Sequence, residues 1–310
     1  MKIRSKRMKY YSLNGLKVPK IVVGCMRIAD KPLRQTEKLI IEALKNGVNM
    51  FDHADIYGKG DSEKMFGIAV KDLEIDRKEL VLQSKCGIRQ GYYDFSYDHI
   101  ISSVDGSLRR LNTEYLDVLL LHRPDALAEP EEVLKAFGAL QSSGKVRAFG
   151  VSNFSESQLR LFKSCGVNIA FNQVQFSLAH TRLIDEGLHV NMGTDDSTQR
   201  GGSLLDYCRL HKIMLQAWSP LQYGKIEGGF LDNEEKYPEL NAELRRLADV
   251  YDVTPAAIAI AWILRHPARM QVVTGTTNFE RLGAICKAAD IELTREEWYG
   301  LYRAAGNKIP

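Results

Sequence analysis

The sequence has no apolar run approaching the roughly 18 residues that a membrane-spanning helix needs. It has five cysteines, an odd number, without the spacing of a zinc site or of a disulfide framework. Its net charge of +3, from 42 basic and 39 acidic residues, is too small to indicate a nucleic-acid partner. These absences argue against a membrane or nucleic-acid partner and favour a soluble protein of the reducing cytoplasm.

The N-terminus lacks the apolar stretch that follows the charges of a secretory signal, although its first nine residues are rich in Lys and Arg. We therefore expect residues 1–9 to form a solvated basic arm. The remaining composition is typical of a globular protein, with 45% hydrophobic and 26% charged residues. Because no linker or internal repeat is visible, we predict a single domain over residues 1–310.

Short runs rich in Val, Ile and Leu alternate with longer stretches of helical periodicity, a pattern that indicates βαβ units and a parallel sheet. The expected strands are residues 21–24, 48–53, 80–85, 116–122, 148–152, 170–174, 213–218 and 271–274. Eight such units in about 300 residues predict one (β/α)₈ TIM barrel. A doubly wound open sheet is the alternative, but its usual glycine-rich phosphate fingerprint is absent after the first strand.

Local signals add detail to the barrel. Asn14-Gly15 predicts an N-terminal β-hairpin, which could cap the bottom of the barrel. Ser155 and Gln158 predict a capping box at the start of a helix. Residues 294–305 predict one extra helix after the last barrel unit.

Polar or aromatic side chains stand where six consecutive expected strands end. They are Asp52 and Tyr57, Lys85, His122, Ser152 and Asn153, Asn172 and Gln173, and Trp218 and Ser219. In a closed parallel barrel these ends converge on one mouth, where barrel enzymes carry their active sites. Two long glycine-containing segments, residues 181–203 and 222–239, are expected at the same mouth. The cluster therefore predicts an active site.

The ordered set of motifs resembles the aldo-keto reductase family over almost the whole chain, and is most like its bacterial YdhF-type branch. The matching motifs are Asp-x-Ala-x-x-Tyr at 52 to 57, Lys85, His122, Gly-Val-Ser-Asn-Phe at 150 to 154, Asn-Gln at 172 to 173 and Trp-Ser-Pro-Leu at 218 to 221. The resemblance implies an NADP-dependent oxidoreductase that transfers hydride from NADPH to an aldehyde or ketone carbonyl of a small molecule.

Four residues match the catalytic positions of that family. Tyr57 would be the general acid, and a neighbouring Lys85 ammonium would lower its pKa from the ordinary value near 10. Asp52 would hold Lys85 charged and oriented, because a lone buried ammonium tends to lose its proton. His122 would orient the carbonyl through a hydrogen bond. Strand alternation points His53 away from Asp52, so we expect it to pack toward the surrounding helices.

The resemblance also implies the residues that bind the cofactor. An aromatic residue would stack on the nicotinamide ring, polar side chains would bind its carboxamide, and backbone amides of one loop would approach the pyrophosphate. These residues are, in the same order, Trp218; Ser152, Asn153 and Gln173; and Ser219, Leu221 and Gly224.

The last strand leads into a helix N-terminus of the kind that holds phosphate in barrel enzymes. Thr276, Thr277, Asn278 and Arg281 would hold an adenosine 2′-phosphate there. Arg281 favours NADPH over NADH, and NADH remains possible because the lysine frequent in the family is replaced by Gly275. The substrate pocket would be walled by Met26, Tyr57 and Trp218 together with the two long segments.

Three other functions account for part of the pattern. A metal-dependent hydrolase using His53, Asp55, His122 and His180 would lack the usual His-x-His pair, so we expect no metal. Asp55 is expected to be a turn residue. A Schiff-base aldolase using Lys85 would not need Tyr57. An NADPH-binding sensor or regulatory protein with little turnover stays as the alternative. The sequence predicts neither the substrate, nor the direction of the reaction, nor the oligomeric state.

Overall fold

Eight parallel strands close into a barrel in the computed structural model, which describes residues 8–13, 15–190, 192, 198, 203–224 and 228–309. Around the barrel the order is β10-β3-β4-β5-β6-β7-β8-β9. The strands are β3 Ile21–Gly24, β4 Met50–Asp52, β5 Val81–Cys86, β6 Leu116–Leu121, β7 Val146–Ser152, β8 Phe171–Gln175, β9 Met214–Trp218 and β10 Gln271–Thr274. The predicted (β/α)₈ barrel is confirmed, although β4 is shorter than expected.

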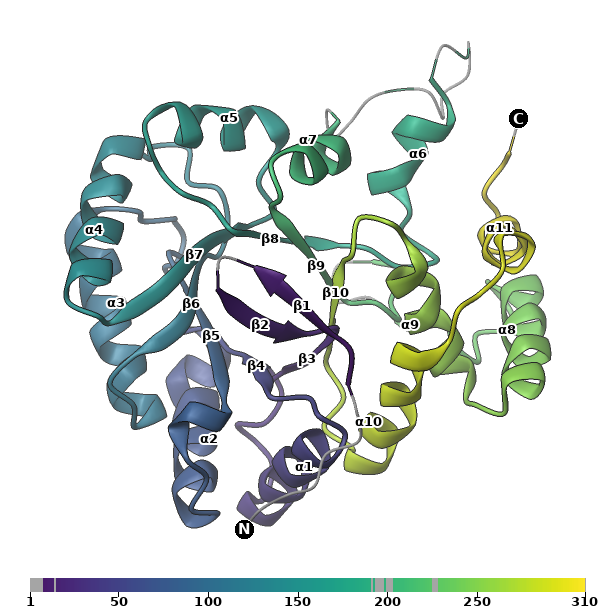
Figure 1. Ribbon diagram of the computed structural model, residues 1–310, viewed down its shortest axis with the longest axis horizontal. Helices are drawn as coiled ribbons and strands as arrows, with labels where there is room; N and C mark the ends of the chain where they lie inside the picture. Colours follow the sequence, from purple (N-terminus) through teal and green to yellow (C-terminus); the bar gives the residue numbers. More distant parts are fainter. Residues whose placement is uncertain are drawn as a thin grey trace.

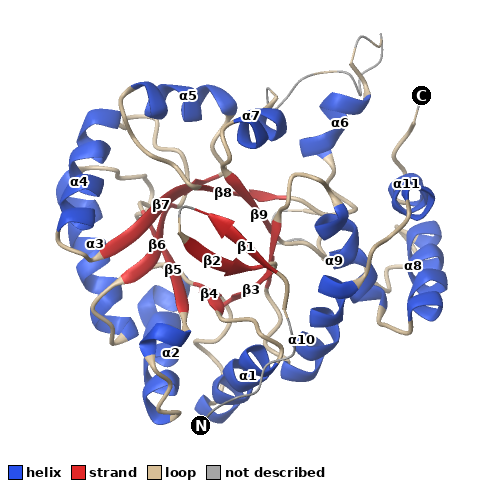
Figure 2. Ribbon diagram, in the orientation of Figure 1, coloured by secondary structure: helices blue, strands red, loops and turns tan. Residues whose placement is uncertain are grey.

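Helices form a ring around the barrel (Figures 1 and 2). They are α1 Leu33–Lys45, α2 Asp61–Asp72, α3 Tyr97–Leu111, α4 Pro130–Ser142, α5 Glu156–Ser164, α6 Arg182–Leu188, α7 Leu204–Leu210, α8 Pro238–Tyr251, α9 Pro255–Arg265, α10 Phe279–Cys286 and α11 Arg295–Ala304, with short 3₁₀ turns η1 Tyr57–Gly60, η2 Arg77–Glu79 and η4 Lys287–Asp290. Among the described residues, no single helix is long and apolar enough to cross a membrane. One pair, α8 with residues 255–264, passes by length and composition but is bent by 91°.

The strands are buried on both faces, which explains their continuous apolar runs. Along β6, Val118 and Leu120 belong to a cluster inside the barrel, whereas Leu119 and Leu121 pack in the larger cluster between barrel and helices. Successive side chains of a strand point to opposite faces, so each strand serves both layers. The same alternation decides which polar residues face the interior.

The predicted hairpin covers one end of the barrel (Figure 1). Strands β1 Tyr10–Leu13 and β2 Leu16–Pro19 pair antiparallel. Leu13 and Val18 are buried against the interior residues Val22, Met50 and Val81, which lie at or near the starts of their strands. The hairpin therefore forms a floor and leaves the carboxyl ends of the strands as the mouth. Asn14 and the arm residues 1–7 lie outside the described residues.

The predicted helix signals are confirmed. Ser155 accepts from the backbone N–H of Gln158, whose side chain accepts from the backbone N–H of Ser155, as in a capping box. The extra helix after the last barrel unit is α11. It packs on α9 and α8 at the side of the barrel.

Candidate active site

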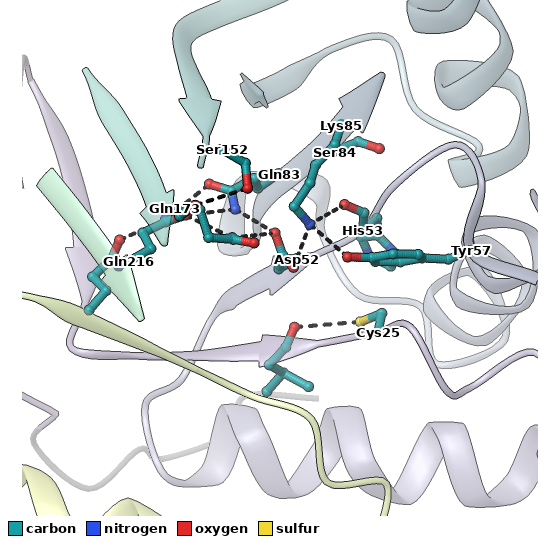
Figure 3. Close-up of polar contacts among 12 residues, drawn as sticks. Cys25, Asp52, His53, Tyr57, Gln83, Ser84, Lys85, Ser152, Gln173 and Gln216 are labelled. Carbon is teal, nitrogen blue, oxygen red and sulfur yellow. Dashed lines mark hydrogen bonds and ion pairs between the residues drawn. The ribbon is translucent and has the colours of Figure 1, made fainter. Parts of the chain in front are cut away.

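Three side chains meet inside the mouth around one ammonium group (Figure 3). Lys85 in β5 donates to Asp52 Oδ2 at 2.7 Å, to the His53 carbonyl oxygen at 2.9 Å and to the Tyr57 hydroxyl oxygen at 3.1 Å. These acceptors match the three hydrogens of an ammonium group. Lys85 and Asp52 are only 1% and 2% exposed, whereas Tyr57, at the start of η1, is partly exposed.

Burial and the neighbouring charges shift the pKa in opposite directions for both Lys85 and Tyr57. Burial alone would lower the pKa of Lys85, but Asp52 and the Tyr57 oxygen outweigh it, so the pKa is raised and the ammonium stays charged. Burial raises the pKa of Tyr57, and Lys85 acts in the lowering direction without reversing it. The expected net lowering of the Tyr57 pKa is therefore wrong. A phenol is protonated at neutral pH even at its ordinary pKa near 10, so Tyr57 is in the form that can donate a proton.

His122 follows β6 and stands beside Tyr57, with ring centroids 5.7 Å apart and planes at 82°. Burial lowers the pKa of His122 well below its ordinary range, and the positive charges of Lys85 and Arg123 lower it further. The imidazole is therefore neutral near pH 7 and carries one N–H donor. Its Nδ1 is buried without a hydrogen-bond partner among the described residues.

A chain of buried glutamines supports Asp52 from the barrel interior (Figure 3). The sequence analysis named only Gln173 among them, and for a different role. Gln83 donates to Asp52 Oδ1 at 2.5 Å, and Gln173 donates to the same oxygen at 3.1 Å. Gln216 accepts from both glutamines and donates to Gln271. Strand alternation was the available signal, because Gln83 lies two residues before Lys85 and so shares its face.

The side chain of His53 packs away from this network, as predicted. Its ring lies 4.6 Å from that of Phe66 in α2 in an edge-on contact, and the side chain is fully buried. Burial lowers the pKa of His53 to about 3, with Lys85 acting in the same direction. His53 is a neutral packing residue at neutral pH.

Asp55, expected only as a turn residue, belongs to a second acidic cluster behind the site. Burial raises its pKa to about 7; the neighbouring Glu63 adds to this rise and Arg110 opposes it. Glu63 is fully buried, accepts a hydrogen bond from Ser84 and pairs with Arg110 at 2.7 Å. The backbone N–H of Asp55 donates to the Lys85 carbonyl oxygen at 3.0 Å, so the loop before Tyr57 is attached to β5.

The residues predicted to bind the nicotinamide lie together. Ser152 Oγ donates to the Gln173 carbonyl at 2.9 Å, and Asn153 Nδ2 donates to Ser152 Oγ at 2.8 Å. Trp218 Nε1 donates to Asn153 Oδ1 at 3.1 Å. The side-chain amide of Gln173 is used within the buried network, where it donates to both Asp52 and Gln216. Of the three residues, only Asn153 is partly exposed, whereas Ser152 and Gln173 are buried.

The residues predicted to bind phosphates lie on two neighbouring loops, because β9 pairs with β10. Ser219, Leu221 and Gly224 follow β9 and are partly exposed. Asn278 caps α10 by accepting from the Arg281 backbone N–H at 2.9 Å.

Thr276 and Thr277, between β10 and this cap, are partly exposed. Arg281 is exposed and has no ion pair within the described part of the chain. Hydroxyl groups, a helix N-terminus and an unpaired guanidinium are the donors that suit a phosphorylated dinucleotide.

Two further expectations concern the pocket and metals. Met26, after β3, is 42% exposed, and Trp218 is partly exposed at the end of β9. Residues 191, 193–197, 199–202 and 225–227 of the two long segments lie outside the described residues. Within the described residues, no group of three His, Cys, Asp or Glu side chains could hold a metal ion.

Comparison with known proteins decides the family. Residues 20–303 match the model of the Aldo/keto reductase family. The chain belongs to this family. This aldo-keto reductase is 35% identical to oxidoreductase YdhF of Escherichia coli, over 96% of this chain and 97% of that protein. It is also 35% identical to 6-dehydroglucose reductase of Agrobacterium fabrum, over 94% and 96% of the two chains.

A solved structure supports the same conclusion. A thermostable aldo-keto reductase in complex with the inhibitor epalrestat is similar, with a TM-score of 0.75 and 25% identity over 96% of this chain and 100% of the other. The predicted resemblance is therefore confirmed. This aldo-keto reductase is an oxidoreductase of small molecules, in a family that generally reduces carbonyl groups with NAD(P)H.

Proposed function

We propose that this aldo-keto reductase reduces an aldehyde or ketone with NADPH, and that Tyr57 donates the proton. The observation that carries the proposal is the contact of one buried ammonium with both a carboxylate and a phenol. Lys85 Nζ lies 2.7 Å from Asp52 and 3.1 Å from the Tyr57 oxygen. This arrangement can stabilise the phenolate that remains after proton transfer.

The roles of the residues follow from their donors. The carbonyl oxygen accepts hydrogen bonds from the Tyr57 hydroxyl and from the neutral His122 ring, which polarises the carbonyl and fixes its angle. The hydride that reaches the carbonyl carbon would come from the nicotinamide, when bound beside Trp218, Ser152 and Asn153. As negative charge develops on the oxygen, the Tyr57 O–H bond breaks and its proton forms the alcohol O–H bond. Lys85 holds the resulting phenolate until solvent returns the proton.

The cofactor is assigned to the donors around the mouth. Ser152 and Asn153 would bind the nicotinamide carboxamide, and the Trp218 ring would lie against the nicotinamide. The loop after β9 would hold the pyrophosphate. Arg281, at the N-terminus of α10, would pair with the adenosine 2′-phosphate and give the preference for NADPH.

The proposal is tested by following the oxidation of NADPH, and then of NADH, with aromatic and aliphatic aldehydes and ketones. We expect turnover that is faster with NADPH at low cofactor concentration. Tight NADPH binding without turnover of any carbonyl would instead favour the sensor role, and binding of neither nucleotide would contradict both assignments.

Arg281→Ala tests the cofactor preference. It removes a charge-assisted hydrogen bond, and we expect KM for NADPH to rise about tenfold while KM for NADH stays constant. Arg295→Ala, at an exposed position on α11, is the control. An equal rise for both nucleotides would contradict the assignment to the 2′-phosphate.

A further inference from the structure

An unpaired arginine stands beside the catalytic residues. Arg123 directly follows His122 in the loop after β6, and it is partly buried. Its guanidinium carbon lies 5.6 Å from the centroid of the Trp218 ring, so the side chain reaches across the mouth from β6 to the end of β9. It forms no ion pair with any residue that the structure describes.

The acidic side chains nearby are occupied elsewhere. Asp125 accepts from the backbone N–H groups of Phe95 and Leu127 at 3.0 and 2.9 Å. Asp94 accepts from Ser96 and lies 3.6 Å from Arg89. Asp52 is bound by Lys85 and the glutamines. Within the described residues, no carboxylate therefore pairs with the charge of Arg123, and its partly exposed guanidinium is available to a ligand.

The position of Arg123 relates this charge to the substrate. His122 is assigned to the carbonyl oxygen, and Trp218 to the nicotinamide and the wall of the pocket. Arg123 contacts the Trp218 ring and directly follows His122 in the sequence. A carbonyl compound held by Tyr57 and His122 therefore has a guanidinium within reach of its remaining groups. The planar guanidinium fork matches a carboxylate through two parallel hydrogen bonds.

We propose that Arg123 is a specificity-determining residue that binds a carboxylate on the substrate, so that the enzyme prefers aldehydes and ketones that carry one. The inference rests on the proposed function, since it concerns the same carbonyl site. It assigns no role to Arg123 in hydride or proton transfer.

The test compares matched substrates. Succinic semialdehyde is paired with butanal, and 4-carboxybenzaldehyde with benzaldehyde, so that each pair differs in one carboxylate. In Arg123→Met we expect kcat/KM for the carboxylate-bearing aldehydes to fall about 10- to 100-fold, mainly because their KM increases. The neutral aldehydes should change by less than about twofold, and Arg123→Lys should keep part of the preference.

Two controls separate this role from others. Arg89→Met removes a positive charge from the loop after β5, where Arg89 already lies 3.6 Å from Asp94, and we expect it to leave the preference unchanged. The Kd of NADPH should stay constant in Arg123→Met. The proposal would be overturned if Arg123→Met lowered kcat/KM equally for charged and neutral aldehydes, if it raised the Kd of NADPH, or if Arg89→Met had the same effect. It would also be overturned if the wild type showed no preference for aldehydes that carry a carboxylate.

A binding measurement keeps the inference independent of turnover. Benzoate, which cannot be reduced, is titrated into the NADP⁺-saturated protein by calorimetry. We expect binding to the wild type and at least tenfold weaker binding to Arg123→Met. If benzoate binding depends on Arg123 but the protein reduces no aldehyde, the proposed function is contradicted while the anion-binding site at Arg123 is supported. If the protein reduces aldehydes but binds benzoate equally well in the wild type and in Arg123→Met, only the inference about Arg123 is contradicted.

Discussion

Protonation at the mouth is set residue by residue, through burial and the nearest charge. Burial lowers the pKa of His122 and so favours its neutral imidazole, and it raises the pKa of the Tyr57 phenol, which is neutral near pH 7 in any case. Lys85 stays charged because the carboxylate of Asp52 lies 2.7 Å away. Neutral donors beside one fixed cation suit a reaction in which negative charge appears on oxygen and must be balanced.

Asp55 gives a test of these electrostatics through stability. Its folded pKa of about 7 lies above the ordinary 3.8, so the folded state binds the proton more tightly and loses stability as pH rises between these values. We expect Asp55→Asn to raise the melting temperature relative to wild type more at pH 8 than at pH 5. Calorimetry at both pH values measures this, with the exposed Asp30→Asn as control. A gain independent of pH would contradict the raised pKa.

At the level of secondary-structure elements, the packing of helix α11 against α9 fixes the extra helix to the barrel. Helix α11 is fixed to α9 by a reciprocal contact in which the indole N–H of Trp262 and that of Trp298 each donate to the other's backbone carbonyl at 3.0 Å. The two rings stack with centroids 4.9 Å apart and planes at 10°. The extra helix is therefore part of the packed structure.

Trp298→Ala should remove both the stacking and one indole hydrogen bond. We expect the free energy of unfolding to fall by about 3 kcal/mol, and by about 1 kcal/mol in Trp298→Phe, which keeps a ring. Urea denaturation of the three proteins measures the difference. A loss below about 1 kcal/mol in the alanine variant would show that α11 contributes little to the fold.

Periodicity and caps made the elements predictable, because they depend on residues close in sequence. The grouping of Asp52, Lys85 and Tyr57 was predictable for a different reason: once a closed barrel is predicted, the ends of its strands must meet at one mouth. The glutamine chain and the Asp55 cluster depend on contacts across several strands or between a loop and two helices. The sign of the Tyr57 shift depends on how deeply it is buried, which sequence alone does not state.

The whole molecule separates stability from chemistry along the barrel axis. The hairpin and the starts of the strands form an apolar floor. Asp52, Lys85 and His122 lie at or just after the opposite, carboxyl ends of β4, β5 and β6. Barrel enzymes commonly divide the two tasks in this way. A change in the floor should therefore alter stability without altering the reaction.

Val18 is fully buried in hairpin strand β2, and Val18→Ala tests this separation. We expect a loss of about 1–3 kcal/mol in the free energy of unfolding from the cavity left behind. The kcat of the remaining folded protein should be unchanged. Lys17→Ala, on the exposed face of the same strand, is the matched control and should change stability by less than about 0.5 kcal/mol. A lower kcat in Val18→Ala would mean that floor and mouth are coupled.

The most direct measurement of the central claim is kcat for aldehyde reduction in wild type and Tyr57→Phe, together with the Kd of NADPH. Loss of the phenolic proton donor should lower kcat by about 10²- to 10⁴-fold while NADPH binding stays constant. A phenylalanine variant with near wild-type kcat would contradict the assignment of Tyr57 as the proton donor.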